Sequence, residues 1–287
     1  MEPDDVEAVD GLSSRCFDDL TRRLDLPTPP NDEPSQEQIA ASHRRLRHLL
    51  NAHAAGAWVI DGDDGPLAAA LALRHEDFWG LSLLVVDPAA QGRGLGRAAL
   101  QAAMTTGEGA GRGLILSSLD PRATRLYRGA GFAEHPGLRA FGRVNRDGLP
   151  HQPATVREAR EDDRELAADV DRAVRGGPHG TDLEPLLAAA DSWWAVDARG
   201  RRGYAILVKN RLALLAAEDI DTARALLVRC LAEADADKEV AVPTLNGATR
   251  WAVEILRGAG PAVHPSGPFF TRGFDPPPLY LPNPAWL

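Results

Sequence analysis

The stretch Leu83–Leu100, LLVVDPAAQGRGLGRAAL, passes from a short apolar segment through three alternating glycines into a helical pattern. Glycine lacks a Cβ atom, so Gly92, Gly94 and Gly96 allow the backbone to turn sharply and to point several N–H groups at one place. The helix predicted to begin near Arg97 adds N–H groups without intrahelical partners and the positive end of a helix dipole. The stretch therefore predicts a binding site for a phosphate or pyrophosphate. A glycine loop that only makes a tight connection is the simpler alternative.

The bulk composition is that of a globular protein. The chain has 287 residues, of which 44% are hydrophobic and 25% charged, a length that predicts two domains of ordinary size. No apolar run approaches the roughly 20 residues that span a bilayer, so we expect no membrane association. The formal net charge of −9 argues against nucleic acid as a partner and favours a cationic substrate. The acidic start MEPDDVEAVDG has no export-signal pattern, so we expect a cytoplasmic protein.

The cysteines and histidines do not form a recognisable metal or disulfide pattern. Cys16 and Cys230 lie far apart in the sequence, and both lie far from the glycine loop, so we expect small core residues and no nucleophile among them. His43, His48 and His53 follow one another at five-residue spacing. That spacing turns successive side chains by roughly 140°, away from the shared face that a ligand pair needs. We therefore predict no metal.

The first half of the chain reads as an ordered series of helices and strands. Residues 3–20 predict a helix with Val6, Leu12, Cys16 and Phe17 on or near its apolar face, and residues 35–53 predict a second helix. Short apolar runs separated by turns predict an antiparallel meander. The expected strands are 57–61, 67–74, 79–87 and 112–120, and the expected later helices are 97–104 and 121–132.

The same order recurs after a stretch of linker composition at residues 144–155. A strand is expected at 155–159, helices follow, and residues 192–218 predict a three-strand meander. The repeat is about half the chain, which indicates duplication. We expect two domains, residues 1–147 and 148–287, with an α/β (α+β) fold in which each domain is a mixed, mostly antiparallel sheet flanked by helices.

Two kinds of phosphate site are compatible with the loop. Gly94-x-Gly96-x-x-Ala99, with Asp120 about 20 residues further on, satisfies a dinucleotide-binding fingerprint. However, that fingerprint requires β-α-β units in a parallel sheet, whereas the turns before the loop are too short for parallel crossovers.

The second reading combines two motifs. Gln91-x-x-Gly94-x-Gly96 after a strand resembles the acyl-CoA pyrophosphate loop of the GNAT acyltransferase superfamily. About thirty residues later, Ala123-x-x-Leu126-Tyr127-x-x-x-Gly131-Phe132 resembles the second motif of that family. The resemblance covers roughly residues 6–143. It implies a mixed sheet whose central strands splay apart to admit pantetheine.

The resemblance also implies roles for individual residues. Acetyl-CoA, or another acyl-CoA, would serve as co-substrate, with pantetheine beside Leu84–Val86 and a backbone N–H near Val85 polarising the thioester carbonyl. Tyr127 matches the usual proton donor to the departing thiolate. Its alternative role is to pack its ring against the sheet. Asp120 stands where many members have Asn beside pantetheine. The pyrophosphate would be cradled by the backbone of Gln91, Gly92, Arg93, Gly94, Gly96 and Arg97.

The second half resembles the same fold without its chemistry. LLAAE passes through Asp219, Ile220 and Asp221 directly into a helix, and two carboxylates in place of glycines would repel phosphate. Aligning Gly260 with Gly131 puts Leu256 at the position of Tyr127. This half is therefore expected to support the first half and to contribute to the acceptor pocket.

Together these features predict a tandem GNAT protein. Its first half would transfer an acetyl group from acetyl-CoA directly to a small-molecule amine, without a covalent enzyme intermediate. No general base is evident, although Glu76, Asp77, Ser117 and Ser118 lie where one could hold a water. A non-catalytic protein that binds or senses acyl-CoA is the alternative, and a dinucleotide-binding protein is the second. The oligomeric state is left open.

Overall fold

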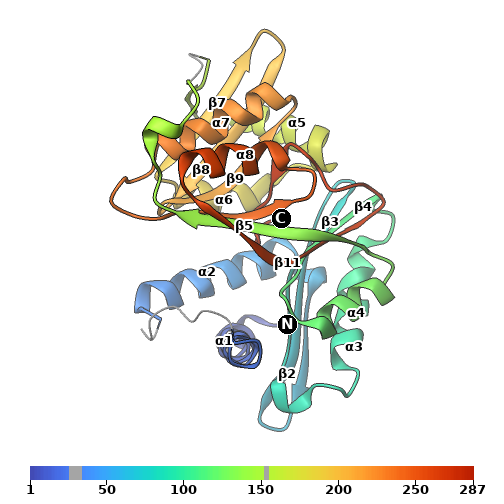
Figure 1. Cartoon of the computed structure of the whole chain (residues 1–287). Helices are drawn as coiled ribbons and strands as arrows, with labels where there is room; N and C mark the ends of the chain where they lie inside the picture. Colours follow the sequence, from blue (N-terminus) through green and yellow to red (C-terminus); the bar gives the residue numbers. More distant parts are fainter. Residues whose placement is uncertain (26–33, 152–154) are drawn as a thin grey trace. The chain divides into compact units, whose positions relative to one another are not determined.

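The computed structural model describes residues 1–25, 34–151 and 155–287. Its contacts divide into two compact units (Figure 1). The first unit contains residues 1–74 and 79–109, and the second contains residues 75–78 and 110–287. The second unit therefore holds residues from both of the halves that the sequence repeat predicts.

Two amphipathic helices open the first unit. After the 3-10 turn η1 (Pro3–Asp5), helix α1 (Val6–Arg23) buries Val6, Val9 and Leu12. Phe17 was expected on this face, but its side chain is 50% exposed. It lies roughly 140° around the helix from Leu12, which places it outside the buried stripe. Helix α2 (Gln36–Ala52) begins at Ser35, whose Oγ accepts the N–H of Gln38 at 3.3 Å.

The predicted meander of the first unit is confirmed. Strand β1 (Ala57–Gly62) is antiparallel to β2 (Gly65–His75), and β2 neighbours β3 (Phe78–Val86) across a two-residue turn. The 3-10 turn η3 (Pro88–Ala90) and the glycine loop follow β3 and lead into helix α3 (Leu95–Met104). The strand–loop–helix order expected around the glycines is therefore present.

The second unit is built on a mixed sheet. Its strands lie in the order β4, β11, β5, β10, β9, β8, β7, β6, and β12 pairs with β9. Among the described residues of this sheet, neighbouring strands pair antiparallel except for β9 and β10, which are parallel. The strand bounds are β4 Arg112–Leu116, β5 Ala133–Gly142, β6 Arg157–Glu158, β7 Ser192–Ala198, β8 Arg201–Val208, β9 Arg211–Ala217, β10 Val240–Asn246, β11 Ala262–Arg272 and β12 Tyr280–Leu281.

Two of these strands differ from the sequence expectation in length. The strand predicted over 112–120 ends at Leu116, because Asp120 caps helix α4 (Pro121–Gly129) and the residues between them form a loop. The strand predicted over 155–159 is reduced to Arg157–Glu158. The stretch 144–155 contains a 3-10 turn, η5 (Arg146–Gly148), and its residues 152–154 lie outside the described part of the chain.

The two sequence halves exchange their long last strands. Strand β5, from the first half, pairs with β10 and β11 of the second half. Strand β11, from the second half, pairs with β4 of the first half, as in Phe270↔Ile115. Figure 1 shows β5 and β11 side by side as long strands. Neither half could therefore complete its own sheet.

Helices of the second unit cover a core that comes mainly from the second half. The core includes Leu215, Leu226, Leu245 and Trp251. Besides α4, the helices of this unit are α5 (Asp163–Arg175), α6 (Leu183–Ala188), α7 (Ile220–Glu233) and α8 (Arg250–Ala259). Among the described residues, no helix has the length and apolar character needed to cross a membrane.

Candidate active site

Two glycines of the loop adopt backbone conformations that other residues rarely take. The backbone angle φ is +80° at Gly92 and +86° at Gly94, in the left-handed region where an L residue is sterically disfavoured. A Cβ atom on either residue would meet nothing within 4 Å. The need for glycine therefore comes from the backbone conformation. Both residues are exposed, and Gly96 already lies in the first turn of α3.

The loop leads straight into the N-terminus of α3. Gly94 precedes the helix, and its carbonyl accepts the N–H groups of Arg97 and Ala98, each at 3.1 Å. The N–H groups just before these have no preceding helical turn to bond to. Arg93 and Arg97 are exposed beside them. The loop thus combines N–H donors, a helix N-terminus and two cations, which suits a pyrophosphate group.

The end of β3 is tied to both α1 and the loop. The carbonyl oxygen of Val86 accepts hydrogen bonds from Cys16 Sγ at 3.2 Å and from Gln91 Nε2 at 3.1 Å. The side chain of Gln91 therefore holds the loop against the strand that the sequence assigns to pantetheine. Within that strand Val85 is buried, and Leu84 is partly buried.

Cys16 is closer to the motifs than the sequence suggests. The expectation that it lies far from them is wrong in space, because α1 brings its thiol to Val86. Burial, followed by the negative charge of Asp87, raises the pKa of the Cys16 thiol to about 11. A thiol with that pKa is protonated near neutral pH and is a poor nucleophile. Cys230 is buried, and burial raises its pKa to about 12.

Tyr127 lies on α4 in the second unit, with a side chain that is only 6% exposed. Its ring meets the ring of Phe270 edge to face, with centroids 5.3 Å apart and planes at 69°. Phe270 belongs to β11, the strand supplied by the second half. Burial, and then the negative charge of Asp120, raises the pKa of Tyr127 above its usual range. The phenol is therefore held in its protonated form, the form that can donate a proton.

Asp120 caps the helix that carries Tyr127. Its Oδ1 accepts the N–H of Arg122 at 2.9 Å, and its Oδ2 lies 3.1 Å from Arg122 Nη2 in an ion pair. Its own N–H donates to Ser118 Oγ at 3.3 Å. By contrast, Ser117 Oγ is buried and has no hydrogen-bond partner among the described residues. Of the two serines, Ser117 has unused hydrogen-bonding capacity.

The two acidic residues of the β2–β3 turn are engaged elsewhere in the second unit. Glu76 pairs with Arg172, whose Nε lies 2.9 Å from Glu76 Oε1. Asp77 Oδ1 accepts the N–H of Gly111 at 2.6 Å. These contacts give both carboxylates a structural role in the turn.

The corresponding loop of the second half is closed by a side chain. Asp219 caps α7: its Oδ1 accepts the N–H of Thr222 at 3.0 Å, and its Oδ2 accepts the Thr222 hydroxyl at 2.5 Å. Asp221 pairs with Arg201 at 2.9 Å. A carboxylate therefore occupies the helix N-terminus that the first half leaves to exposed glycines.

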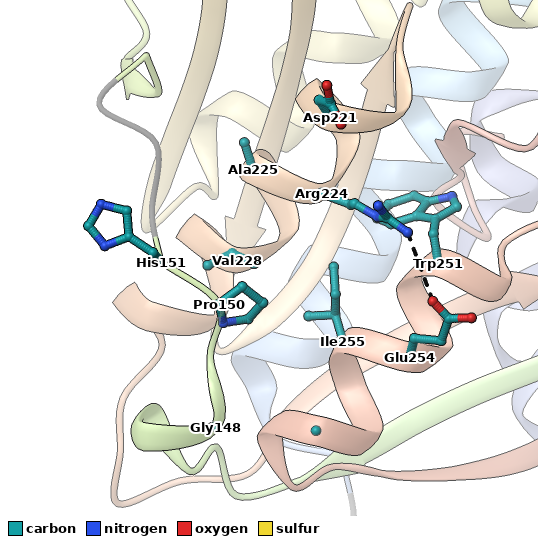
Figure 2. Close-up of a pocket in the computed structure, with 11 residues that line it drawn as sticks. Gly148, Pro150, His151, Asp221, Arg224, Ala225, Val228, Trp251, Glu254 and Ile255 are labelled. Atoms are coloured by element: carbon teal, nitrogen blue, oxygen red, sulfur yellow. Dashed lines mark ion pairs between the residues drawn. The ribbon is translucent and has the colours of Figure 1, made fainter.

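A pocket of about 480 Å³ lies between α7 and α8 of the second half (Figure 2). Arg224 and Glu254 face each other across it at 3.9 Å, and Trp251 forms part of its wall. It contains none of the residues that the sequence assigns to chemistry. Both carboxylates that line it are paired with arginines: Asp221 with Arg201 at 2.9 Å and Glu254 with Arg224.

Two parts of the site could not be found by motif. The contact of Phe270 with Tyr127 depends on the strand exchange, since nothing in the local sequence of β11 indicates its neighbour. The contact of Cys16 with Val86 depends on how α1 packs. The helical pattern around Cys16 was the available signal, because it placed the thiol on the apolar face.

Comparisons with known proteins were made for sequence and for structure. A model of the Acetyltransferase (GNAT) family matches residues 19–132. No curated protein matches the chain. A putative acetyltransferase from Pyrococcus horikoshii is similar in structure, with a TM-score of 0.69 and 16% identity over 100% of this chain and 93% of that one. A GCN5-related N-acetyltransferase from Sphaerobacter thermophilus has a TM-score of 0.58 and 15% identity, over 96% of both chains. The likeness in fold thus extends well beyond residue 132.

Proposed function

We propose that the chain, whose residues 19–132 match the Acetyltransferase (GNAT) family, is an acyltransferase that transfers the acetyl group of acetyl-CoA directly to a small amine. The observation that carries the proposal is the exposed loop Gln91–Arg97, with left-handed glycines, at the N-terminus of α3. It lies inside the matched region and after the expected strand.

Residues of the first unit would bind and polarise the thioester. Backbone N–H groups of the loop hold the pyrophosphate, and Arg93 and Arg97 add charge. The backbone of Leu84–Val86 forms hydrogen bonds with pantetheine in the way that a strand edge bonds an added strand. A backbone N–H near Val85 stabilises negative charge on the carbonyl oxygen as the amine attacks. When bound, acetyl-CoA supplies an activated acyl group and a thiolate leaving group.

Tyr127 would supply the proton that the thiolate needs. Burial keeps the phenol of Tyr127 protonated near neutral pH, so the proton to be donated is present. Asp120 caps α4, the helix that carries Tyr127. The thiols of Cys16 and Cys230 are protonated near neutral pH, which supports direct attack by the amine.

The dinucleotide alternative lacks the architecture that it needs. Strands β1 and β2 are antiparallel, and two-residue turns join β1 to β2 and β2 to β3, whereas a dinucleotide fold places a helical crossover between parallel strands. The net charge of −9 is compatible with an amine acceptor that carries a positive charge before it is deprotonated.

Calorimetry on the full chain tests the cofactor assignment. We expect acetyl-CoA to bind and NAD not to bind. Gly94→Ala should weaken acetyl-CoA binding by about tenfold, because an alanine at φ +86° is strained by roughly 1–2 kcal/mol and shifts the loop amides. The matched control is Gly11→Ala, in the interior of α1, where alanine is the better helix former. Tight NAD binding without acetyl-CoA binding would overturn the assignment, and an unchanged affinity in Gly94→Ala would place the pyrophosphate elsewhere.

A further inference from the structure

The C-terminal segment of the chain, residues 278–287, is seated on strand β9 of the second half. Within it, β12 pairs antiparallel with β9 through Tyr280↔Ala216 and Leu281↔Leu215. The N–H of Ala217 also donates to Leu279 O at 3.0 Å. Tyr280, Leu281, Trp286 and Leu287 are all at most 5% exposed. The segment is therefore an integral part of the core.

The edge of β9 that the segment occupies is the edge that faces β10. The opposite edge is taken by β8. Strands β9 and β10 are parallel and are paired at a single position near their beginnings, Arg211↔Ala241. Beyond that point β12 takes the place beside β9.

Side chains from both sides of this opening hold the segment. From β10, the hydroxyl of Thr244 donates to Pro282 O. From α8, the indole N–H of Trp251 donates to Pro278 O at 2.7 Å. The segment reaches back through Asn283 Nδ2, which donates to Ala213 O on β9 at 3.1 Å. It is thus bonded to β9, β10 and α8.

The paired residues of β9 correspond to the strand proposed for pantetheine in the first half. LSLLVVD at 81–87 aligns without a gap with LALLAAE at 212–218. Leu84, Val85 and Val86 then correspond to Leu215, Ala216 and Ala217. These three residues are the ones that β12 and Leu279 engage.

We propose that residues 278–287 act as a built-in substitute for pantetheine, permanently filling the cofactor cleft of the second half. The cap at Asp219 closes the pyrophosphate end of the same cleft. The second half therefore binds no acyl-CoA, and the chain has one cofactor site. The comparison with pantetheine rests on the proposed function of the first half, whereas the seating of the segment does not.

Hydrogen exchange on the full-length protein, with and without saturating acetyl-CoA, tests the proposal. The amides of residues 278–287 should exchange on the order of 10²-fold or more slowly than those of a free peptide, and acetyl-CoA should leave their rates unchanged. Calorimetry should give one acetyl-CoA per chain. Fast exchange of the segment, its deprotection by acetyl-CoA, or two bound equivalents would each overturn the proposal.

A pair of tryptophan variants isolates the anchoring contact. Trp251→Phe removes the hydrogen bond to Pro278 O and should speed exchange of residues 278–287 about fivefold. The matched control is Trp193→Phe, because Trp193 Nε1 is buried without a hydrogen-bond partner among the described residues. Equal changes in the exchange rates of residues 278–287 in the two variants would show that the hydrogen bond from Trp251 to Pro278 O does not anchor the segment.

Failure of the proposed function has a different signature. If the first half binds no acetyl-CoA, peptides covering Gln91–Arg97 gain no protection when it is added. The protection of residues 278–287 and its partial reduction in Trp251→Phe would still be observed.

Discussion

The side chain of Cys16 contacts the end of β3, although Cys16 lies 70 residues before Val86 in the sequence. Its thiol bonds to the carbonyl of Val86, at the end of the strand proposed for pantetheine. A thiol beside the strand proposed for pantetheine is a candidate nucleophile for covalent catalysis. Its pKa, raised to about 11 by burial, argues against that role.

We expect Cys16→Ser to retain acyl transfer within about threefold of the unsubstituted protein. A hydroxyl can keep the hydrogen bond to Val86 O, and direct attack by the amine needs no cysteine. Initial rates of thiol release measure the effect, and mass spectrometry of the protein after incubation with acetyl-CoA detects any acetylated cysteine. Abolished turnover together with an acetylated Cys16 in the unsubstituted protein would contradict direct transfer.

The tyrosines give a prediction about pH. The chain has three tyrosines, Tyr127, Tyr204 and Tyr280, and burial raises the pKa of each. A raised pKa in the folded state means that the unfolded state loses these protons first, so the stability they contribute is present at neutral pH and is lost as the pH rises above about 10. Spectrophotometric titration should show tyrosinate only above that pH, together with loss of structure. A tyrosine that ionises near pH 10 in the folded protein would contradict the burial of that side chain.

At the scale of elements, β11 connects the second half to the proposed proton donor. Successive residues of a strand point to opposite faces of the sheet, and of the adjacent pair Phe269 and Phe270 it is Phe270 that contacts Tyr127. Both rings are nearly fully buried. Substitutions at the two positions can therefore distinguish a loss of core packing, which both would cause, from a loss of contact with Tyr127, which only Phe270 makes of the two.

We expect Phe270→Leu to lower kcat about tenfold with little change in KM for acetyl-CoA, because Tyr127 loses the ring edge that orients it. The matched control Phe269→Leu should cost a similar amount of stability, about 1 kcal/mol, and leave kcat near its original value. Thermal unfolding and steady-state kinetics measure the two effects. Equal losses of kcat in both variants would show that Phe270 acts only through stability.

Local sequence patterns predicted the helices and strands more completely than they predicted which strands pair with each other. The glycines, the turn before α4 and the apolar runs gave the meanders and the strand–loop–helix order, since these depend on backbone conformation and local periodicity. The pairing of β4 with β11 and of β5 with β10 joins residues that lie about 100 positions or more apart in the sequence. Because both halves carry equivalent strands, the local sequence favours either pairing equally.

At the scale of the whole molecule, the strand exchange makes the two halves interdependent. Strand β5 pairs with β10 and β11, which both come from the second half, and the partner of β4 in the second unit is β11. Removing the second half would expose these edges, which are prone to aggregate. The loss of chemistry in the second half is therefore compatible with a retained structural role.

We predict that residues 1–147 expressed alone do not form a stable folded protein, since β5 lacks both of its partners, β10 and β11, and β4 lacks β11. Circular dichroism and size-exclusion chromatography of the fragment should show an expanded or aggregated chain. A monomeric fragment that unfolds cooperatively and acetylates at the rate of the full chain would contradict this dependence.

The central claim is that the full chain transfers acetyl groups with Tyr127 as proton donor, and thiol release from acetyl-CoA tests it most directly. The measurement compares the unsubstituted protein and Tyr127→Phe across a panel of cationic and neutral amines. We predict amine-dependent release that falls on the order of 10²-fold in kcat in Tyr127→Phe, with acetyl-CoA binding unchanged. Acetyl-CoA binding without release for any amine would indicate a binding or sensing protein, and full turnover in Tyr127→Phe would remove Tyr127 from the mechanism.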